Sequence, residues 1–208
     1  MNKKINVSTV IIAGVIIAAV GLLIWGGSKN KSETPAVDQH GHPLATNVPA
    51  VPLDELTNKS APDFSLADRD GKIYSLNELQ GKNIILFFNE GLMCYPACWS
   101  QIASLAKDER LGGDDVVVLS VVVDPPEKWQ EAIDEMPELA QATVVFDKGA
   151  MASRRFGMLT TASSMHYGSL PGHSFILIDK EGVIRHIFDD PNMSIHNDEL
   201  VKEIAKLN

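Results

Sequence analysis

The chain has 208 residues, of which 45% are hydrophobic and 22% are charged, an ordinary composition for a globular protein. Its formal net charge is -9 at pH 7, and Lys and Arg form no cluster along the sequence. Binding to nucleic acid, or to anionic lipid through a basic face, is therefore not expected, because neutralising phosphates requires clustered cations.

The N-terminal segment predicts a membrane anchor. Residues 5–27 carry no charge and are rich in Val, Ile, Ala and Leu, which is enough to span a bilayer core of about 30 Å. A cleaved signal peptide is the alternative, but it usually has a shorter apolar region and a small-residue cleavage site. Positive charges beside a membrane span favour the cytoplasmic side. Two lysines and the terminal amine precede the span and two lysines follow it, so the count slightly favours a cytoplasmic N-terminus. We therefore expect residues 1–27 to be a single-pass signal anchor in the cell membrane, with the rest of the chain extracytoplasmic.

Residues 28–60 predict a flexible linker, because they are polar, contain several prolines and lack hydrophobic periodicity. His40 and His42 lie in this stretch. Two histidines one residue apart can ligate a metal, but a linker offers no second shell to orient them, so we interpret them as ordinary linker residues. Residues 61–208 are long enough to form one hydrophobic core.

Hydrophobic patterns predict an α/β domain in residues 61–208. Two continuous apolar runs, 83–89 and 116–123, are typical of strands buried on both faces of a parallel sheet. Trp99, Ile102 and Leu105 recur between them at helical spacing, which indicates a right-handed strand, helix, strand unit. In chain order, the other expected elements are a short helix opened by the capping box Ser75–Glu78 and ended by Gly81, a helix over 129–136, a strand over 143–146, a short helix over 150–156, an antiparallel hairpin over 174–188 and a helix over 197–207.

Both cysteines lie in Cys94-Tyr95-Pro96-Ala97-Cys98, directly after the first buried strand and at the start of a helix. A helix N-terminus stabilises negative charge and lowers a thiol pKa. We therefore expect Cys94 to be the exposed, thiolate-like nucleophile and Cys98 to be the resolving cysteine.

The spacing of the cysteines constrains their conformation. Helical residues four apart have Cβ atoms about 5 to 6 Å from each other, whereas a disulfide requires roughly 3.8 Å, so oxidation requires a non-helical Cys94. The spacing permits disulfide chemistry and soft-metal binding. Two inert structural cysteines are the alternative.

Three more side chains are expected at the same sheet edge, where the carboxyl ends of the strands lie. Asp124 ends the second apolar run, and His173 opens a strand that we expect to be antiparallel to its neighbours. Glu90 precedes the cysteine motif and is either a proton-transfer group or a solvated loop charge, and Asp124 is a second candidate for proton transfer. For His173, a hydrogen-bonded structural role is the alternative to a functional one.

The segment 157–172 is a long connection rich in Ser, Thr and Gly beside this edge, which predicts a lid. It contains Met158, Met165 and His166. Together with Met193, these residues are either copper ligands or ordinary packing residues.

From Ala61 onward, the sequence resembles the thioredoxin-like superfamily and, within it, the AhpC/TSA (redoxin, peroxiredoxin-like) family. The resemblance implies a thioredoxin-like fold, with a mixed central sheet flanked by helices, and an oxidoreductase that acts on thiols, disulfides or peroxide. The similar motifs are Ala61-Pro62-Asp63-Phe64-Ser65-Leu66, Asp70-Gly71-Lys72, Leu86-Phe87-Phe88, Asp124-Pro125, and Ser174-Phe175-Ile176-Leu177-Ile178-Asp179 with Gly182.

The peroxiredoxin pattern implies Cys98 as the peroxidatic cysteine. In that pattern Thr or Ser stands three residues earlier and Pro opens the motif, and a distant arginine stabilises the transition state. Here Tyr95 and Gly91 occupy the first two positions, and Gly172 lies about where the arginine is expected.

Two other members of the superfamily are also similar. Membrane-tethered thiol-disulfide oxidoreductases have a cis-proline facing Cys-x-x-Cys, and Pro171 is the candidate for that proline. Sco-like copper chaperones have the Cys-x-x-x-Cys spacing, a following Asp-Pro and a distal histidine, which implies copper ligation by Cys94, Cys98 and His173.

We therefore predict a membrane-anchored thiol redox protein with antioxidant activity, acting through Cys94 and Cys98 and requiring no cofactor. Its partner would be a thiol or disulfide protein, or a peroxide substrate. The alternative is a Sco-like metallochaperone that binds copper through these cysteines and His173. A membrane-tethered adaptor with a vestigial site is the third hypothesis.

Overall fold

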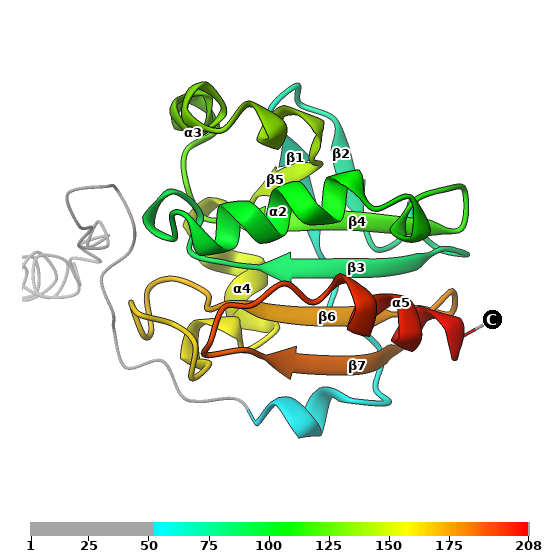
Figure 1. Cartoon of the computed structure of the whole chain (residues 1–208). Helices are drawn as coiled ribbons and strands as arrows, with labels where there is room; N and C mark the ends of the chain where they lie inside the picture. The colour runs from blue at the N-terminus through cyan, green and yellow to red at the C-terminus, as the bar shows by residue number, and fades with distance from the viewer. Residues whose placement is uncertain (1–51, 208) are drawn as a thin grey trace, which may run out of the picture. The chain divides into compact units, whose positions relative to one another are not determined.

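A seven-stranded mixed sheet organises residues 52–207, which are the residues that the computed structural model describes. The strand order is β2-β1-β5-β4-β3-β6-β7 (Figure 1). The strands are β1 (Ser65–Asp68), β2 (Ile73–Ser75), β3 (Asn83–Phe88), β4 (Val116–Val122), β5 (Val144–Phe146), β6 (Ser174–Ile178) and β7 (Ile184–Asp189). The helices are α2 (Ala97–Lys107), α3 (Trp129–Glu135), α4 (Met151–Arg155) and α5 (Asn197–Ala205).

The centre of the sheet is parallel and its margins are antiparallel. β3, β4 and β5 run parallel, whereas β6 pairs antiparallel with β3 and β7 pairs antiparallel with β6. On the other side, β1 pairs antiparallel with both β5 and β2. The expected mixed sheet, the crossover through α2 and the antiparallel hairpin near the C-terminus are all confirmed.

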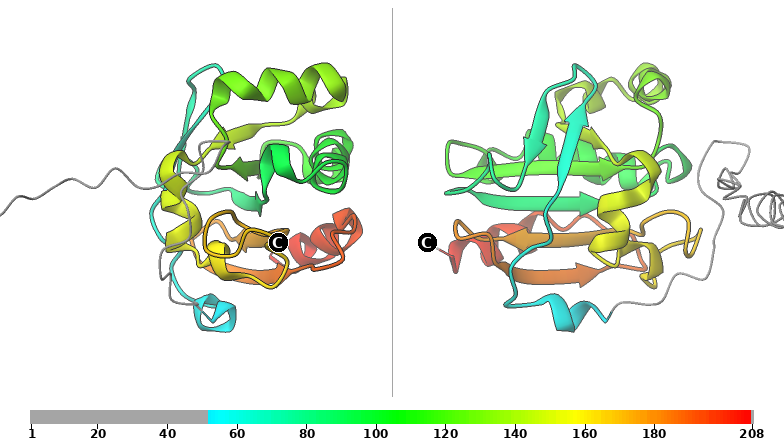
Figure 2. Two further views of the ribbon diagram at one scale, coloured as in Figure 1. Left: turned by 90° about the vertical axis from the view of Figure 1, so that its left-hand side faces the viewer. Right: turned by 180° about the vertical axis from the view of Figure 1, so that it is seen from behind.

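Helices cover both faces of the sheet, and the left view of Figure 2 shows them on opposite sides. Ile85 and Phe87 of β3 pack in one core with residues of α2, α3 and α5. Ile84, Leu86 and Phe88 belong to the other core, which includes residues around α4. Because alternate β3 side chains enter opposite cores, all six residues of the strand are buried, as the continuous apolar run predicted.

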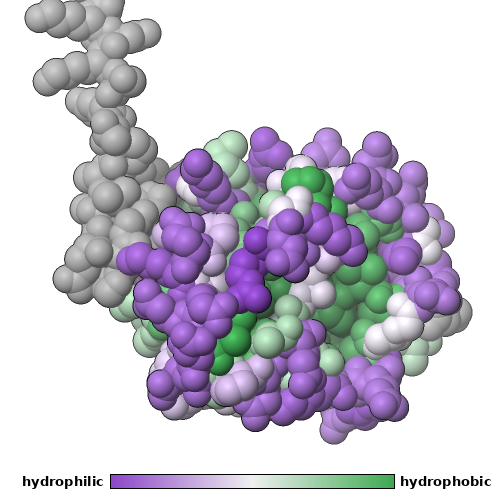
Figure 3. Space-filling view, turned by 90° about the horizontal axis from the view of Figure 1, so that it is seen from above, coloured by the Kyte–Doolittle hydropathy of each residue, from purple (hydrophilic) through white to green (hydrophobic). Residues whose placement is uncertain are grey.

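The surface on the side of α3 and β2 is largely hydrophilic, and hydrophobic side chains are visible in its hollows (Figure 3). One cavity there lies between β2, β4 and the end of α2, and its lining includes Tyr74, Ile102 and Val118. The lining contains neither cysteine nor histidine. This cavity therefore offers no thiol chemistry.

The helix predicted after the capping box at Ser75–Glu78 is absent, and hydrogen-bonded turns occupy residues 76–81 instead. The first capping contact does form, since the Glu78 amide donates to Ser75 Oγ at 3.3 Å, but the Glu78 carboxylate accepts from the Ser75 hydroxyl at 3.1 Å rather than from its amide. Gly81 then turns the chain with φ of 86°. The stretch is too short to propagate a helix beyond its costly first turn.

The folded region begins before Ala61, so the predicted linker boundary is too late. A 3-10 helix, η1 (Leu53–Leu56), precedes it, the Asn58 amide donates to the Ile184 carbonyl at 2.7 Å, and Ser60 forms a bridge with Val183. The predicted anchor at residues 1–27 and most of the linker lie outside the described residues. Within 52–207, no helix is long and apolar enough to cross a membrane.

Candidate active site

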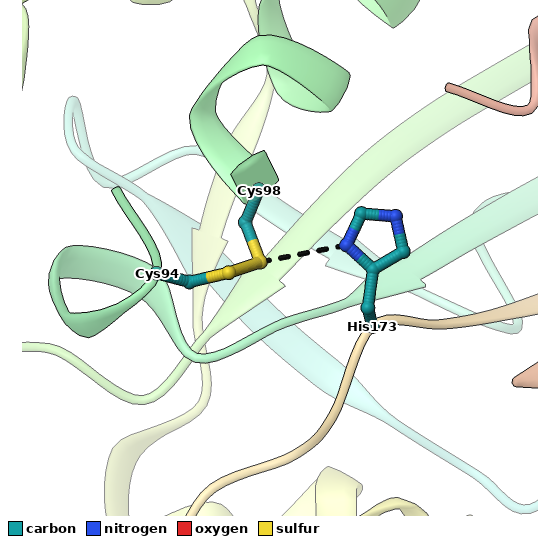
Figure 4. Close-up of side chains that lie close together, drawn as sticks. All are labelled: Cys94, Cys98 and His173. Atoms are coloured by element: carbon teal, nitrogen blue, oxygen red, sulfur yellow. Dashed lines mark hydrogen bonds between the residues drawn. A yellow bond between two sulfur atoms is a disulfide. The ribbon is translucent and has the colours of Figure 1, made fainter. Parts of the chain in front are cut away.

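Cys94 and Cys98 form a disulfide just beyond the carboxyl end of β3 (Figure 4). Their Cα atoms are 5.3 Å apart. Cys94 has φ of −108° and ψ of 40°, which is not helical, whereas Cys98 lies in the first turn of α2. The prediction that oxidation requires a non-helical Cys94 is confirmed.

Both sulfurs are covered, which contradicts the predicted exposure of Cys94. The exposed fraction is 2% for Cys94 and 0% for Cys98. Met193 Sδ lies 3.8 Å from Cys94 Sγ, and Leu92 packs against the same core cluster. The physical reason is a cover contributed by the chain after β7, a segment more than 90 residues away in the sequence.

A close backbone approach shapes the turn that leads into the cysteines. Gly91 has φ of 57°, and a Cβ atom there would overlap with the carboxylate of Asp124. That carboxylate accepts a hydrogen bond from the Leu92 amide at 3.1 Å, and Trp99 Nε1 donates to the Gly91 carbonyl at 2.9 Å. Asp124 thus reaches the expected edge, where it holds the turn η2 (Gly91–Met93). Its role in proton transfer stays a prediction.

His173 lies directly against the disulfide, as Figure 4 shows. Its Nδ1 is 3.5 Å from Cys98 Sγ, and its Nε2 is 3.2 Å from the Ser194 carbonyl. A carbonyl can only accept, so Nε2 carries the proton in the neutral imidazole and the Nδ1 lone pair faces the sulfur. The ring meets Phe87 and Phe175 edge-on, with centroids 4.7 and 5.4 Å away.

Burial is the main cause that lowers the pKa of His173, to about 4, and it outweighs the opposing effects of the Ser194 carbonyl and of Asp190. His173 is therefore neutral at pH 7. Cys94, Cys98 and His173 are brought together as predicted, and their potential ligand atoms all lie within 4.8 Å of one another.

Glu90 is buried, so its interpretation as a solvated loop charge is wrong. Its exposed fraction is 1%. The carboxylate accepts hydrogen bonds from the amides of Met165 and His166 at 2.6 and 3.0 Å and contacts His166 Nδ1 at 3.0 Å. Its hydrogen bonds thus anchor the 157–172 loop. A role in proton transfer stays a prediction.

The 157–172 loop is packed closely against its own residues. A side chain at Gly172 would collide with Ser163 and Thr161, so this position cannot hold an arginine. The cis peptide bond of the described residues lies between Tyr95 and Pro96, so the prediction of a cis-proline at Pro171 is wrong.

The second set of candidate copper ligands does not gather at one place. It comprises Met158, Met165, His166 and Met193. Met158 is fully buried in the core around α4, whereas Met165 is exposed and His166 contacts Glu90. Only Met193 lies at the sulfurs. Met158 is thus a packing residue.

The segment 190–196 was missed by reasoning from the sequence. Asp190 accepts hydrogen bonds from the Asn192 and Ser194 amides at 2.8 and 2.7 Å and contacts His196 Nε2 at 2.7 Å. Burial raises the pKa of Asp190, but these partners outweigh it and hold the pKa at about 2. An Asp followed by Pro signals a turn, but no local pattern shows that this turn folds over Cys94.

Comparison with known proteins matches the AhpC/TSA family model to residues 57–187. The chain belongs to the AhpC/TSA family. It is 34% identical over 141 residues to "Peroxiredoxin Bcp" of Escherichia coli (strain K12), covering 66% of this chain and 88% of that protein. It is 27% identical over 137 residues to "Peroxiredoxin Q, chloroplastic" of Triticum aestivum, covering 62% of this chain and 57% of that protein.

Solved structures share the fold of this AhpC/TSA member. A peroxiredoxin-like protein from Aquifex aeolicus has a TM-score of 0.60 at 18% identity, covering 80% of this chain and 92% of its own. A putative protein disulfide isomerase from Bacteroides thetaiotaomicron has a TM-score of 0.57 at 21% identity, covering 73% and 89%. The predicted thioredoxin-like fold is confirmed. As a member of this family, the chain is an oxidoreductase that acts on thiols and disulfides or on peroxide.

Proposed function

We propose that the Cys94–Cys98 pair is the redox centre of a membrane-anchored, extracytoplasmic thiol oxidoreductase that exchanges electrons with a protein dithiol or disulfide. The observation that carries the proposal is the disulfide at the start of α2. A pair of cysteines at a helix N-terminus beyond the strand ends has both the geometry to bridge and a local dipole that favours thiolate. The charge-free segment 5–27 supports the anchor.

The reaction transfers two electrons. A partner thiolate attacks Cys94 Sγ, the bond to Cys98 breaks, and Cys98 leaves with the electron pair and takes up a proton. A second partner thiolate attacks the mixed disulfide and releases Cys94 as a thiolate. The partner then carries a disulfide and this chain carries two thiols, and the reverse sequence reduces a partner disulfide.

Peroxide is the alternative oxidant of the same dithiol, in the manner that the names of the relatives indicate for those proteins. The thiolate of Cys98, the position that the peroxiredoxin pattern implies as peroxidatic, would attack one peroxide oxygen, forming a sulfenic acid and releasing hydroxide or alkoxide. The Cys94 thiol would then displace the hydroxyl group as water and re-form the disulfide.

Two assays on the full-length chain test this proposal. In the first, the dithiol form is mixed with insulin, and disulfide reduction is followed. In the second, it is mixed with hydrogen peroxide, and free thiols are counted with time. The wild type is expected to reduce insulin, and Cys94→Ser is expected to lose turnover.

Cys98→Ser is expected to accumulate a mixed disulfide at Cys94, because the resolving thiol is absent. Loss of thiols to peroxide without insulin reduction would place peroxide as the substrate. Full insulin reduction by Cys94→Ser would refute the mechanism.

Copper binding is the second candidate function, favoured by the grouping of Cys94, Cys98 and His173 within 4.8 Å. Two thiolates and an imidazole form a soft donor set that suits Cu(I). In the reduced protein the two sulfurs and His173 Nδ1 would hold the ion. The site would then serve to carry copper to another protein.

Cu(I) titration of the reduced full-length chain decides between these functions. A Cu(I) affinity that is at least tenfold lower in His173→Ala than in the wild type, but unchanged in His186→Ala, supports the copper function. His186 is a suitable control because it lies on β7 and contacts Glu199 rather than the sulfurs. Equal affinity of the wild type and His173→Ala would exclude the three-ligand site.

A further inference from the structure

The segment 190–196, between β7 and α5, carries the residue that covers the reactive sulfur. Met193 Sδ is in van der Waals contact with Cys94 Sγ at 3.8 Å, and Cys94 retains an exposed fraction of only 2%. A nucleophile must touch the sulfur that it attacks. Met193 therefore has to move before Cys94 can react.

Met193 is held in this position by the surrounding chain rather than by its own preference. Its φ is 53°, a left-handed conformation that is unfavourable for a residue other than glycine because Cβ crowds the following carbonyl oxygen. Its amide donates to the Asp190 carbonyl at 3.1 Å, and the carboxylate of Asp190 accepts from the amides on either side, those of Asn192 and Ser194. The cover is thus a built feature of the fold.

The same segment is tied to two elements of the site. The Ser194 carbonyl contacts His173 Nε2 at 3.2 Å, and the His196 amide donates to Gln101 Oε1 of α2 at 2.8 Å. Displacement of Met193 thus disturbs the hydrogen bond that orients His173 against Cys98. Segment 190–196 therefore controls both access to the Cys94 sulfur and the orientation of His173 against the Cys98 sulfur.

Exposed apolar side chains flank Met193 and Cys94 in the sequence. Tyr95, next to Cys94, is 56% exposed, and Ile195, two residues after Met193, is 49% exposed. A polypeptide can place an apolar side chain against such residues and so compensate for the contacts that Met193 loses. A small thiol has no group that could do this.

We propose that Met193 is a specificity-determining residue that closes the oxidised Cys94 to small thiols and admits polypeptide thiols able to displace segment 190–196. The inference rests on the proposed function and narrows its electron donor. The chemistry is the exchange described above, in which the polypeptide dithiol loses two electrons and the Cys94–Cys98 bond is broken.

The test compares two reductants on the oxidised full-length chain. Reduced glutathione is the small thiol and reduced thioredoxin is the polypeptide dithiol, and protein thiols are counted after acid quenching to give second-order rate constants. Met193→Gly removes the side chain and suits the left-handed backbone. Met193→Leu retains an apolar side chain of similar size, and Met151→Ala removes an exposed methionine on α4.

Met193→Gly is expected to raise the glutathione rate constant at least tenfold while changing the thioredoxin rate constant less than threefold. The other two variants should stay within threefold of the wild type. A glutathione rate constant unchanged in Met193→Gly, or an equal rise with both reductants, would overturn the specificity role. If thioredoxin and insulin both fail to exchange with the wild type, the proposed function fails, whereas the glutathione comparison still reports whether Met193 shields Cys94.

Discussion

At the scale of single residues, the site depends on Gly91, a position where only glycine fits. Gly91 approaches the Asp124 carboxylate too closely for a Cβ atom and has φ of 57°. The identity of Gly91 distinguishes this chain from the proline-led peroxiredoxin motif. Asp124 therefore shapes the turn before the disulfide by occupying the space beside this glycine.

Gly91→Ala is expected to lower the free energy of unfolding by about 2 to 4 kcal/mol, because it adds steric overlap to a strained backbone. Gly71→Ala is the matched control, since Gly71 also has a positive φ, of 82°, but nothing lies within 4 Å of its added Cβ. It should cost only about 1 kcal/mol. Urea unfolding measures both, and equal losses would contradict the close approach.

The lowered pKa of Asp190 predicts how the stability of the fold depends on pH. Its pKa of about 2 lies below the ordinary 3.8, so its ionised form stabilises the folded state. That contribution is fully present above pH 3.8 and is lost as the pH falls through 2.

Asp190→Asn is therefore expected to be about 2 kcal/mol less stable than the wild type at pH 7, with the gap narrowing below pH 4. Urea unfolding at pH 7, 5, 4 and 3 measures the gap, and Asp70→Asn, at an exposed position, is the control. A gap that stays constant over this range would refute the assignment.

At the scale of elements, β3 to β7 and α2 to α5 followed from local pattern, whereas β1, β2 and the loops did not, and the helix expected after the capping box is absent. The continuous apolar runs identified β3 and β4: every residue of β3 is buried, and so are the last four residues of β4, whereas its first three are half-buried. His173 was placed at the site because the start of an antiparallel strand lies at the carboxyl edge of its neighbours. The burial of Cys94 and the partners of Glu90 depend on loops distant in sequence, whose contacts leave no periodic signal.

Glu90→Gln tests whether the 157–172 loop is anchored from the end of β3. Replacing a carboxylate that accepts two backbone N–H bonds should destabilise the loop by about 1 to 3 kcal/mol. Amide hydrogen exchange at Met165 and His166 is expected to accelerate by at least tenfold. Exchange in α5 provides an internal reference, and Glu127→Gln, at an exposed position, should leave both regions unchanged. Unaltered exchange at these two amides would show that Glu90 is not the anchor.

At the scale of the whole molecule, the fold was predictable and part of the reaction was not. The mixed pairing and the covering of both faces of the sheet agree with the thioredoxin-like expectation. The meeting of Cys94, Cys98 and His173 followed from topology. Which partner reaches the sulfurs depends on tertiary contacts of Met193 and Ser194, which no local rule describes.

The disulfide should contribute only modestly to global stability. It joins residues four apart in the sequence, and closing so short a loop in the unfolded chain corresponds to about 2 kcal/mol. Reduction with a phosphine is therefore expected to lower the free energy of urea unfolding by about that amount and to leave a cooperative transition. The double variant Cys94→Ser, Cys98→Ser should show no response to the phosphine. Complete unfolding on reduction would mean that the bond is structural.

The burial of β3 between β4 and β6 also bears on how this protein could be redesigned. The strand is hydrogen-bonded on both sides, so the starting point of the cysteine segment is rigidly mounted, while the groups that touch or overlie the sulfurs come from chain segments at the ends of the strands. A protein engineer could therefore replace His173 and the 190–196 sequence on an unaltered sheet to change the chemistry of the thiols. Swaps within β3 would disturb both cores at once.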